Sequence, residues 1–533
     1  MNTTKRLALN CALFAFLIPG LAIFTQAQNI SGANSSLQEA IQESPDRQLP
    51  GGADTTQRLR FWNEIALKAN GRDHARLAPL RPDQPGPVRT ARAFAIVHIA
   101  IFDAYNAIVG GFESYTGFRP ILSDTSSTNL VEGDIDVDGT RRRASVDAAI
   151  IEAAAITLKA LYPSQATDIE NVRRVDLGSI PASTAKNNGI IIGRQAANAI
   201  LSRRSNDGSN HPEPEFAVDL NGDGVVYTPN PAFGKWRRDP VSTTPQNPGL
   251  ALGALWGRLV RPFVILSAGQ FRPVSPPALS SAAYAAAFNE VKRLGGDGVT
   301  TPTARTADQT IAGIYWGYDG TPFVGTPNRL YNQITVQIAQ QMGTSGIRLA
   351  RLLALVNVAM ADAGLVCWEA KYREEFWRPV TGIRAGNIDS NLNTIGDPNF
   401  VPLGSPASNT NGPNFTPPFP AYTSGHATFG GALFQVMRRF YLTDGIAFNF
   451  ISDEFNGITR DIQGRVRPLV LRHFASLTAA EEENGQSRIY LGVHWSFDKT
   501  EGIKQGRRVG DFIFNNSFRR LTFGGVLTSD DTN

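Results

Sequence analysis

The chain has 533 residues, with 51 Lys and Arg against 47 Asp and Glu, which gives a formal net charge of +4. The basic residues are scattered, and Arg141-Arg142-Arg143 is the one basic triplet, so the composition argues against nucleic-acid binding. A chain of this length favours two or more domains.

The N-terminus predicts an export signal over residues 1–27. A basic start at Lys5-Arg6 precedes an apolar run over 7–24 and then small residues suited to cleavage. Pro19 interrupts the run, which argues against a retained membrane span, and no later stretch reaches ~18 consecutive apolar residues. We therefore expect an exported protein, periplasmic or secreted, that is not embedded in a membrane.

The chain contains two cysteines. Cys11 lies in the predicted signal, so Cys367 would remain alone and an intrachain disulfide in the mature protein is excluded. We expect Cys367, beside Trp368, to be a small buried apolar residue rather than a reactive thiol.

Long amphipathic segments dominate the rest of the chain. Residues 28–55 are polar and predict a flexible tail, and residues 521–533 form a C-terminal tail. Between them, apolar residues recur with a period near 3.6, which predicts helices. These helices cover 56–69, 88–109, 142–161, 184–202, 280–294, 346–376, 425–440 and 499–518. Strand signals are few. The sequence therefore predicts an all-α protein of packed helical bundles, with an N-terminal bundle region over 56–300 and a C-terminal bundle over 301–520.

Two Asp-rich loops match the first half of a calcium-binding EF-hand loop, at residues 134–139 and 219–224. Position twelve is Ser145 in one and Asn230 in the other, so both lack the bidentate glutamate. This favours Asp/Gly turns, with calcium as the alternative.

Three segments in the last third of the chain carry residues that suit a highly charged oxyanion. The first is Ser424-Gly425-His426, which opens a predicted helix. Ser424 is a typical N-cap, and a helix N-terminus binds anions through its free N–H groups. Gly425 would let a ligand oxygen approach the backbone, and His426 would project from the first turn.

The second segment contains Lys371 and Arg378, which are seven residues apart and share one helix face if the helix runs that far. Pro379 disfavours helical geometry at Arg378, so the helix is predicted to end there. The guanidinium at the tip could then direct two donors at an anion oxygen.

The third segment contains Arg488 and His494. They are six residues apart, about 240° around a straight helix, so a bend at Gly492 is needed to turn both towards one site. His494 and Asp498 are four apart on one face, so the carboxylate could orient the imidazole ring.

Together the segments resemble the signature of the vanadium-dependent haloperoxidases and, more distantly, of the type 2 phosphatidic acid phosphatase superfamily. They read Lys371-x6-Arg378-Pro379, Thr423-Ser424-Gly425-His426 and Ser487-Arg488-x5-His494-x3-Asp498. Thr423 departs from the family, which usually has proline there. The stretches 361–368, 417–441 and 491–498 are similar to the fungal chloroperoxidase branch, and the likeness covers residues 310–500. It implies two four-helix bundles, with extra helices and long loops.

The resemblance also implies a vanadate cofactor with hydrogen peroxide and halide as substrates. The residues that would hold the vanadate oxygens, together with the vanadium ligand, form what we call the oxyanion cradle: Lys371, Arg378, Ser424, Gly425, Arg488 and His494. His494 would be the ligand of the metal. His426 would be the acid–base group for the peroxide proton, and Lys371 would make the peroxide more electrophilic.

Further roles follow from the same resemblance. Asp319 would pair with Arg378 behind the cradle, and Asp498 would support His494. Trp368 and Phe419 would line the halide path, where an apolar wall removes water from a small halide. Their joint presence favours chloride and bromide oxidation to hypohalous acid, which would halogenate a small organic acceptor.

Two other functions fit parts of the sequence. An exported acid phosphatase could use the same cradle, with His494 attacking phosphorus and His426 protonating the leaving group. A secreted, calcium-stabilised binding protein without catalysis would be expected to lack a cradle residue, and the sequence has them all.

Overall fold

The computed structural model describes residues 53–76, 81–122, 144–244 and 249–521. The predicted signal, nearly all of the 28–55 tail, the 134–139 loop and the C-terminal tail beyond residue 521 lie outside these ranges. Residues 49–533 form one compact unit. The predicted division at residue 300 stays a prediction.

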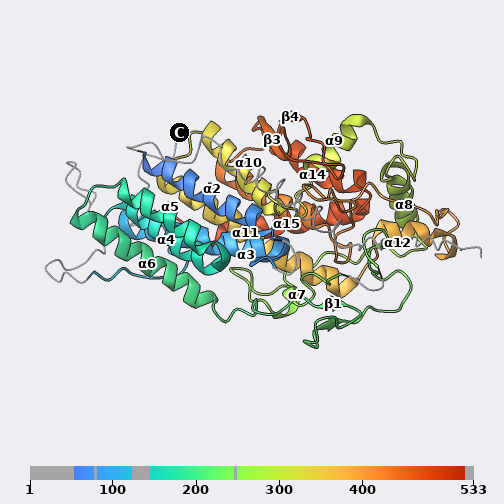
Figure 1. Ribbon diagram of the computed structural model, residues 1–533, viewed down its shortest axis with the longest axis horizontal. Coiled ribbons are helices and arrows are strands. Elements are labelled where there is room, and N and C mark those ends of the chain that lie inside the picture. Colours follow the sequence, from blue (N-terminus) through green and yellow to red (C-terminus); the bar gives the residue numbers. More distant parts are fainter. Residues whose placement is uncertain (1–52, 77–80, 123–143, 245–248, 522–533) are drawn as a thin grey trace, which may run out of the picture. The chain divides into compact units, whose positions relative to one another are not determined.

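The all-α helical-bundle class is confirmed. The helices are α2 (Thr55–Asp73), α3 (Gly86–Val109), α4 (Val146–Leu161), α5 (Ala166–Gly178), α6 (Thr184–Arg204), α7 (Trp256–Leu259), α8 (Ala282–Leu294), α9 (Ala307–Tyr315), α10 (Pro327–Gln341), α11 (Gly346–Glu374), α12 (Pro379–Arg384), α13 (Gly425–Tyr441), α14 (Leu477–Tyr490) and α15 (Ser496–Asn516). Short 3₁₀ turns cover Pro163–Gln165 and Gly386–Ile388. All eight predicted helices are present, within a few residues at each end (Figure 1).

Strands are few in the described residues. A parallel pair joins β1 (Glu215–Phe216) to β2 (Val226–Tyr227), and an antiparallel hairpin joins β3 (Phe448–Asn456) to β4 (Leu469–Phe474). The register of the hairpin places Phe448 opposite Phe474. Since β3 alternates buried and exposed side chains over most of its length, one face packs on the helices and the other meets solvent.

Helix α11 is the centre of the core. It packs against α3, α13, α15, α7 and α2, and its side chains from Leu349 to Trp368 are buried with few gaps. Both α3 and α11 are long and apolar enough on average to cross a membrane, although charged residues interrupt both, so neither is the continuous apolar run considered above. However, 78% and 94% of their most apolar stretches are buried inside the molecule, which is typical of core helices of a globular protein.

Glycines bring α13 and α15 into close backbone contact. A Cβ atom on Gly506 would lie 2.1 Å from the carbonyl oxygen of Thr428, and one on Gly510 would lie 2.7 Å from that of Ala432. Only a residue without a side chain allows this approach. The first turn of α13, which carries the Ser424 motif, is therefore fixed against α15.

A long segment with little regular structure follows α6, over residues 205–281. It crosses the C-terminal end of α11, because the Trp236 N–H donates to the Glu375 carbonyl at 2.7 Å and the Trp377 N–H donates to the Gly234 carbonyl at 3.0 Å. It then runs beside the 415–419 loop, where the Leu252 N–H donates to the Pro418 carbonyl at 3.0 Å. This segment thus covers the region of the cradle.

Candidate active site

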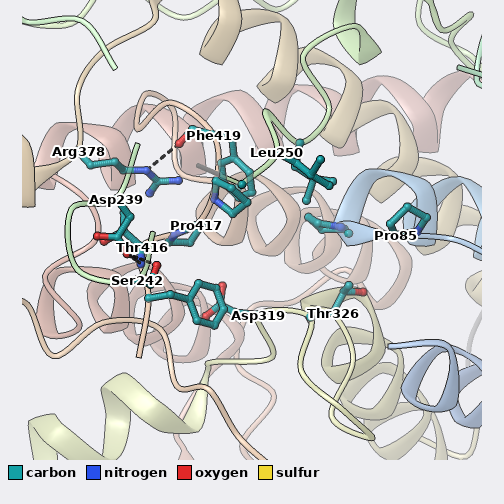
Figure 2. Close-up of a pocket in the computed structure, with 18 of the residues that line it drawn as sticks. Pro85, Asp239, Ser242, Leu250, Asp319, Thr326, Arg378, Thr416, Pro417 and Phe419 are labelled. Carbon is teal, nitrogen blue, oxygen red and sulfur yellow. Dashed lines mark hydrogen bonds between the residues drawn. The ribbon is translucent and has the colours of Figure 1, made fainter. Parts of the chain in front are cut away.

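Four of the six cradle residues line a cavity of about 420 Å³, whereas Lys371 and Ser424 lie behind its wall and do not line it. Arg378, Gly425, His426, Arg488 and His494 all line it. In Figure 2, Arg378 and Phe419 lie across the cavity from Asp319 and Thr326, with Leu250 and Pro85 towards one end. The three sequence segments therefore meet at one place, as predicted.

The N-terminus of α13 is built as the sequence indicates. Ser424 is the N-cap, and its Oγ accepts a hydrogen bond from the Ala427 N–H at 3.4 Å. The Ser424 N–H donates to the Asp498 carbonyl at 3.0 Å, which ties the cap to α15. At Gly425, a Cβ atom would lie 3.3 Å from the Trp368 ring, so the glycine keeps this wall of the cavity open.

Lys371 lies in the last turn of α11 and is fully buried. Its Nζ donates to the carbonyls of Pro420 at 2.9 Å, Ala421 at 2.9 Å and Thr423 at 2.5 Å, so it fixes the segment that leads into α13. Burial lowers the pKa of Lys371 to about 7. Cys367 packs behind the same segment, with its Sγ 3.6 Å from the Thr423 carbonyl and no solvent exposure.

Arg378 reaches the cavity differently from our prediction. Helix α11 ends at Glu374, and Glu375 takes a left-handed conformation with φ of 48°, so Arg378 is not at the tip of the lysine's helix. It is instead the N-cap residue of α12. Its Nε donates to the Phe419 carbonyl at 2.9 Å, the bond drawn in Figure 2, and its Nη1 donates to the Val493 carbonyl at 2.8 Å. Burial lowers the pKa of Arg378 to about 9.

Asp319 pairs with Arg488, and the expected pairing with Arg378 was wrong. The Arg488 Nη2 lies 2.9 Å from both carboxylate oxygens of Asp319 and donates to the Ser405 Oγ at 3.1 Å. Both side chains of the ion pair are almost wholly buried. The pair fixes the guanidinium plane at the cavity, a role that the family resemblance had implied for the other arginine.

His494 is turned into the cavity by the bend predicted at Gly492, which has φ of 72°. Its Nδ1 lies 2.9 Å from the Asp498 Oδ2, and the same oxygen accepts from the Trp495 N–H at 3.0 Å. Burial, with the nearby Arg378 charge, lowers the pKa of His494. The ring is therefore neutral with its proton on Nδ1, which leaves the Nε2 lone pair facing the cradle, 2.9 Å from Arg378 Nη1.

His426 is also neutral but has the opposite tautomer. Its Nε2 lies 2.7 Å from the Gly317 carbonyl, an acceptor that requires the proton on this nitrogen. Burial, followed by the Arg488 charge, lowers the pKa of His426 to about 3. Its Nδ1 is thus free to accept a proton.

The cradle fits a tetrahedral or trigonal-bipyramidal anion. Three buried guanidinium nitrogens in it have no acceptor among the described residues: Arg378 Nη2, Arg488 Nε and Arg488 Nη1. Buried donors are rarely left unpaired, because each costs about 1–3 kcal/mol. Donors of two arginines, the α13 N-terminus and one imidazole lone pair together match an oxyanion whose central atom accepts a nitrogen ligand.

An aromatic wall borders the cradle. The Trp368 and Phe419 ring centroids are 4.8 Å apart, and both side chains line the cavity. Lys371 Nζ lies 5.0 Å from the Phe419 ring centre and Arg378 Cζ also lies 5.0 Å from it, so two cations flank this ring.

Sequence reasoning missed the supports behind these groups. The Tyr331 hydroxyl donates to the His426 carbonyl at 3.1 Å and to Asn484 Oδ1 at 3.0 Å, and the Asn484 amide donates to the same carbonyl at 2.9 Å. Asn484 lies one helical turn before Arg488, a spacing that could have revealed it. Glu454 on β3 accepts from Arg467 and from the Tyr318 N–H, so it holds the loop that carries Asp319.

The second Asp-rich loop, at 219–224, closes on its own backbone. Asp219 accepts from the N–H groups of Gly222 at 2.8 Å and Gly224 at 3.1 Å, and Asp223 accepts from Val225 at 2.8 Å. The described residues contain no group of three or more His, Cys, Asp and Glu side chains placed to hold a metal. The turn conformation accounts for these residues, and calcium stays an alternative.

Comparison with known proteins gives concordant results. Residues 351–522 match a family model described as the VCPO second helical-bundle domain. The chain is 33% identical over 500 residues to the vanadium chloroperoxidase of Curvularia inaequalis, across 83% of this chain and 79% of that protein. Among solved structures it is similar to a bacterial vanadium-dependent iodoperoxidase, with a TM-score of 0.63 and 24% identity over 88% of this chain and 98% of that one. It is also similar to a bacterial vanadium-dependent chloroperoxidase, with a TM-score of 0.58 and 17% identity over 85% and 97% of the two chains.

Proposed function

The chain belongs to the vanadium-dependent haloperoxidase family, and on that premise we propose that it binds vanadate and oxidises chloride or bromide with hydrogen peroxide to hypohalous acid. An organic acceptor is then halogenated. Export, from the N-terminal pattern of the sequence, is part of the same proposal.

The observation that carries the proposal is the set of unpartnered buried donors on Arg378 and Arg488 beside His494 Nε2, whose lone pair faces Arg378 Nη1 at 2.9 Å. These arginines would neutralise the vanadate oxygens, with Ser424 and the Gly425 N–H completing the hydrogen bonds. His494 Nε2 would bind the vanadium. When bound, vanadate supplies a Lewis acid that activates peroxide while the vanadium keeps its oxidation state.

His426 is the proposed acid–base group. Its Nε2 proton is held by the Gly317 carbonyl, and its Nδ1 is a free acceptor. Burial and Arg488 keep the ring neutral, which leaves Nδ1 unprotonated but makes it a weak base. Negative charge in the cradle would oppose this effect on the pKa, so that Nδ1 could take a proton from incoming hydrogen peroxide and return it to the leaving oxygen. The Tyr331 and Asn484 bonds to the His426 backbone keep this nitrogen in place.

Lys371 is the proposed cation that polarises the peroxide. Its three bonds to the carbonyls of Pro420, Ala421 and Thr423 direct the ammonium at the turn before α13. To donate to a ligand oxygen, Nζ would exchange one of these bonds. Negative charge in the cradle would favour the protonated lysine and so oppose the effect of burial on its pKa.

Trp368 and Phe419 support the chloride and bromide assignment. They present apolar ring surface at the cradle, and the cations of Lys371 and Arg378 flank Phe419. A halide that enters this wall loses water while it stays close to positive charge, so it becomes a better nucleophile. Since similar structures include both a chloroperoxidase and an iodoperoxidase, the halide must be determined by rate measurements with all three ions.

The experiment is reconstitution of the purified protein with orthovanadate. Halogenation of a small β-diketone with peroxide and each halide is measured beside hydrolysis of an aryl phosphate. We expect halogenation that depends on vanadate. Phosphate ester turnover that vanadate only inhibits, with no halogenation, would establish the acid phosphatase instead.

Two variants separate the proposed roles. His494→Ala should lose stable vanadate binding in equilibrium dialysis, and His426→Ala should keep binding but lose most turnover. The matched control is His473→Ala, at an exposed histidine on β4, which should keep both. Undiminished vanadate binding by His494→Ala would contradict the ligand assignment.

A further inference from the structure

The cavity is much larger than the proposed reactants of the cradle require. Peroxide and a halide are each about the size of one or two water molecules, and a water occupies roughly 30 Å³ in the liquid. The cavity of about 420 Å³ is instead within the size range of sites for small organic ligands. It therefore contains an outer chamber beyond the cradle.

The wall of this outer chamber is mostly apolar and comes from three parts of the chain. It is formed by the turn before α3, the 205–281 segment and the loop before α13. Its apolar members include Pro85, Phe216, Trp236, Leu250, Leu252 and Pro417. The aromatic rings are flat surfaces against which another ring can stack, and the prolines add stiff apolar surface.

The chamber is held in shape by bonds that do not depend on a ligand. Phe216 and Trp236 are buried and pack edge to face with centroids 4.9 Å apart. The Phe216 N–H donates to the Gly249 carbonyl at 3.0 Å, next to Leu250. Leu252 packs against Gly86, where a Cβ atom would lie 2.6 Å from the leucine side chain.

Two of the three charged residues of the outer wall, Asp239 and Arg237, are occupied by the protein itself. Asp239 accepts from the Thr416 N–H at 2.9 Å and from the Ser242 Oγ at 2.6 Å, close to the labelled Pro417 in Figure 2. Arg237 donates to backbone carbonyls, including that of Asn230 at 2.7 Å. Arg238 also lines the cavity and has no hydrogen bond or ion pair among the described residues. This wall therefore offers a ligand mainly apolar contact, with one guanidinium for a polar group such as a ring hydroxyl.

We propose that the outer chamber binds an electron-rich aromatic acceptor of about two fused rings, so that halogen transfer takes place beside the cradle. This inference rests on the proposed function, which supplies the oxidant: peroxide, halide and one proton give hypohalous acid and water. The acceptor ring then forms a carbon–halogen bond as the oxygen–halogen bond breaks. The ring proton leaves and joins the released hydroxide as water, so the net products are the aryl halide and water.

A scavenger experiment tests where the transfer occurs. The vanadate-loaded protein is given bromide, peroxide and 2-naphthol with a large excess of methionine, which removes hypobromous acid from solution. We expect bromonaphthol to persist, whereas methionine should suppress it when reagent hypobromous acid replaces the enzyme. Equal suppression in both reactions would overturn the chamber proposal. A β-diketone assay without scavenger reports halide oxidation separately, so failure of the function itself is distinguishable.

A filled chamber provides the second test. Leu250→Trp should lower 2-naphthol bromination relative to β-diketone bromination at least about tenfold, the scale on which steric fit discriminates substrates. Leu392→Trp, at a leucine that is 98% exposed, is the matched control and should keep the wild-type ratio. Binding is measured without turnover by 2-naphthol quenching of tryptophan fluorescence in vanadate-free protein. A wild-type ratio in folded Leu250→Trp, or no saturable quenching in the wild type, would refute the proposal.

Discussion

Asp498→Asn tests the support of the proposed vanadium ligand. The Asp498 Oδ2 accepts from both the His494 Nδ1–H and the Trp495 N–H, and the side chain is fully buried. Asparagine has the same shape and can place its carbonyl oxygen at this position. Burial raises the pKa of Asp498 to about 7, against the opposing effect of the Trp495 N–H and the Lys371 and Arg378 charges. The substitution therefore removes the charge of the ionised carboxylate, which makes the His494 ring a stronger electron donor and fixes its tautomer.

The expected loss of vanadate affinity follows from the support that the Asp498 charge gives to the His494 ring. Partners behind a metal-ligating histidine typically contribute 10–100-fold to metal affinity, which is about 1.4–2.8 kcal/mol. If the amide instead turns its NH₂ towards His494, Nδ1 must become the acceptor and the proton moves to Nε2. The lone pair that faces the cradle is then lost, and the effect should reach the upper end of this range.

The assay is equilibrium dialysis against orthovanadate at neutral pH, with bound vanadium measured by mass spectrometry. Circular dichroism and thermal unfolding confirm that the variant is folded. Asp308→Asn, at an exposed aspartate paired with Arg472, is the matched control and should bind like the wild type. A folded Asp498→Asn protein with a Kd within twofold of the wild type would refute the reasoning.

Three further predictions concern stability. His98 is buried with its Nε2 unpartnered among the described residues, and burial lowers its pKa from 6.5 to about 3, so only the unfolded chain takes up a proton between these values. In urea unfolding, the free energy of unfolding should fall by up to about 1.4 kcal/mol per pH unit below pH 6.5 because of this histidine. His98→Leu should lose this part of the pH dependence. Gly506→Ala should lower the free energy of unfolding by about 1–3 kcal/mol and weaken vanadate binding, because its Cβ would press on the Thr428 carbonyl. Gly178→Ala is the control, since a Cβ there meets nothing within 4 Å. Equal melting curves for the two variants would contradict the close contact. Glu454→Gln breaks a buried ion pair with Arg467 and should lower the free energy of unfolding, measured with denaturant, by about 3–5 kcal/mol. An unchanged denaturation midpoint would rule out the proposed support of the 317–319 loop.

The parts of the site that could be predicted are those determined by neighbours in sequence. The N-cap at Ser424, the bend at Gly492 and the His494–Asp498 bond each depend on four residues or fewer. Their physical cause is local: a free helix end, a backbone that requires positive φ, and a one-turn spacing on a helix.

The predictions that were wrong concern features that depend on distant residues or on an interrupted helical period. The partner of Asp319 lies 169 residues away, so spacing could not distinguish Arg488 from Arg378. The end of α11 at Glu374 is set by a left-handed Glu375 that fixes the start of the next loop, although the apolar pattern runs on to Phe376.

Helices with weak amphipathic patterns were missed for a related reason. Helix α14 has the sequence LTAAEEENGQSRIY, in which polar residues fill most positions, yet Glu481, Asn484 and Arg488 are buried. Its inward face combines the apolar contacts of Leu477, Ala480 and Ile489 with hydrogen bonds and ion pairs of these polar residues, so no continuous apolar stripe marks it in the sequence. The 205–281 segment has no period at all, so its position over the cradle follows only from tertiary contacts.

The burial of Cys367 has a consequence for the durability of the protein. Its sulfur lies 3.6 Å from the Thr423 carbonyl, has no solvent exposure and does not line the cavity, so hypohalous acid made there would not meet this thiol directly. Thiols are among the groups that such oxidants attack first. The burial of Cys367 would thus protect the molecule from chemical damage by the proposed product.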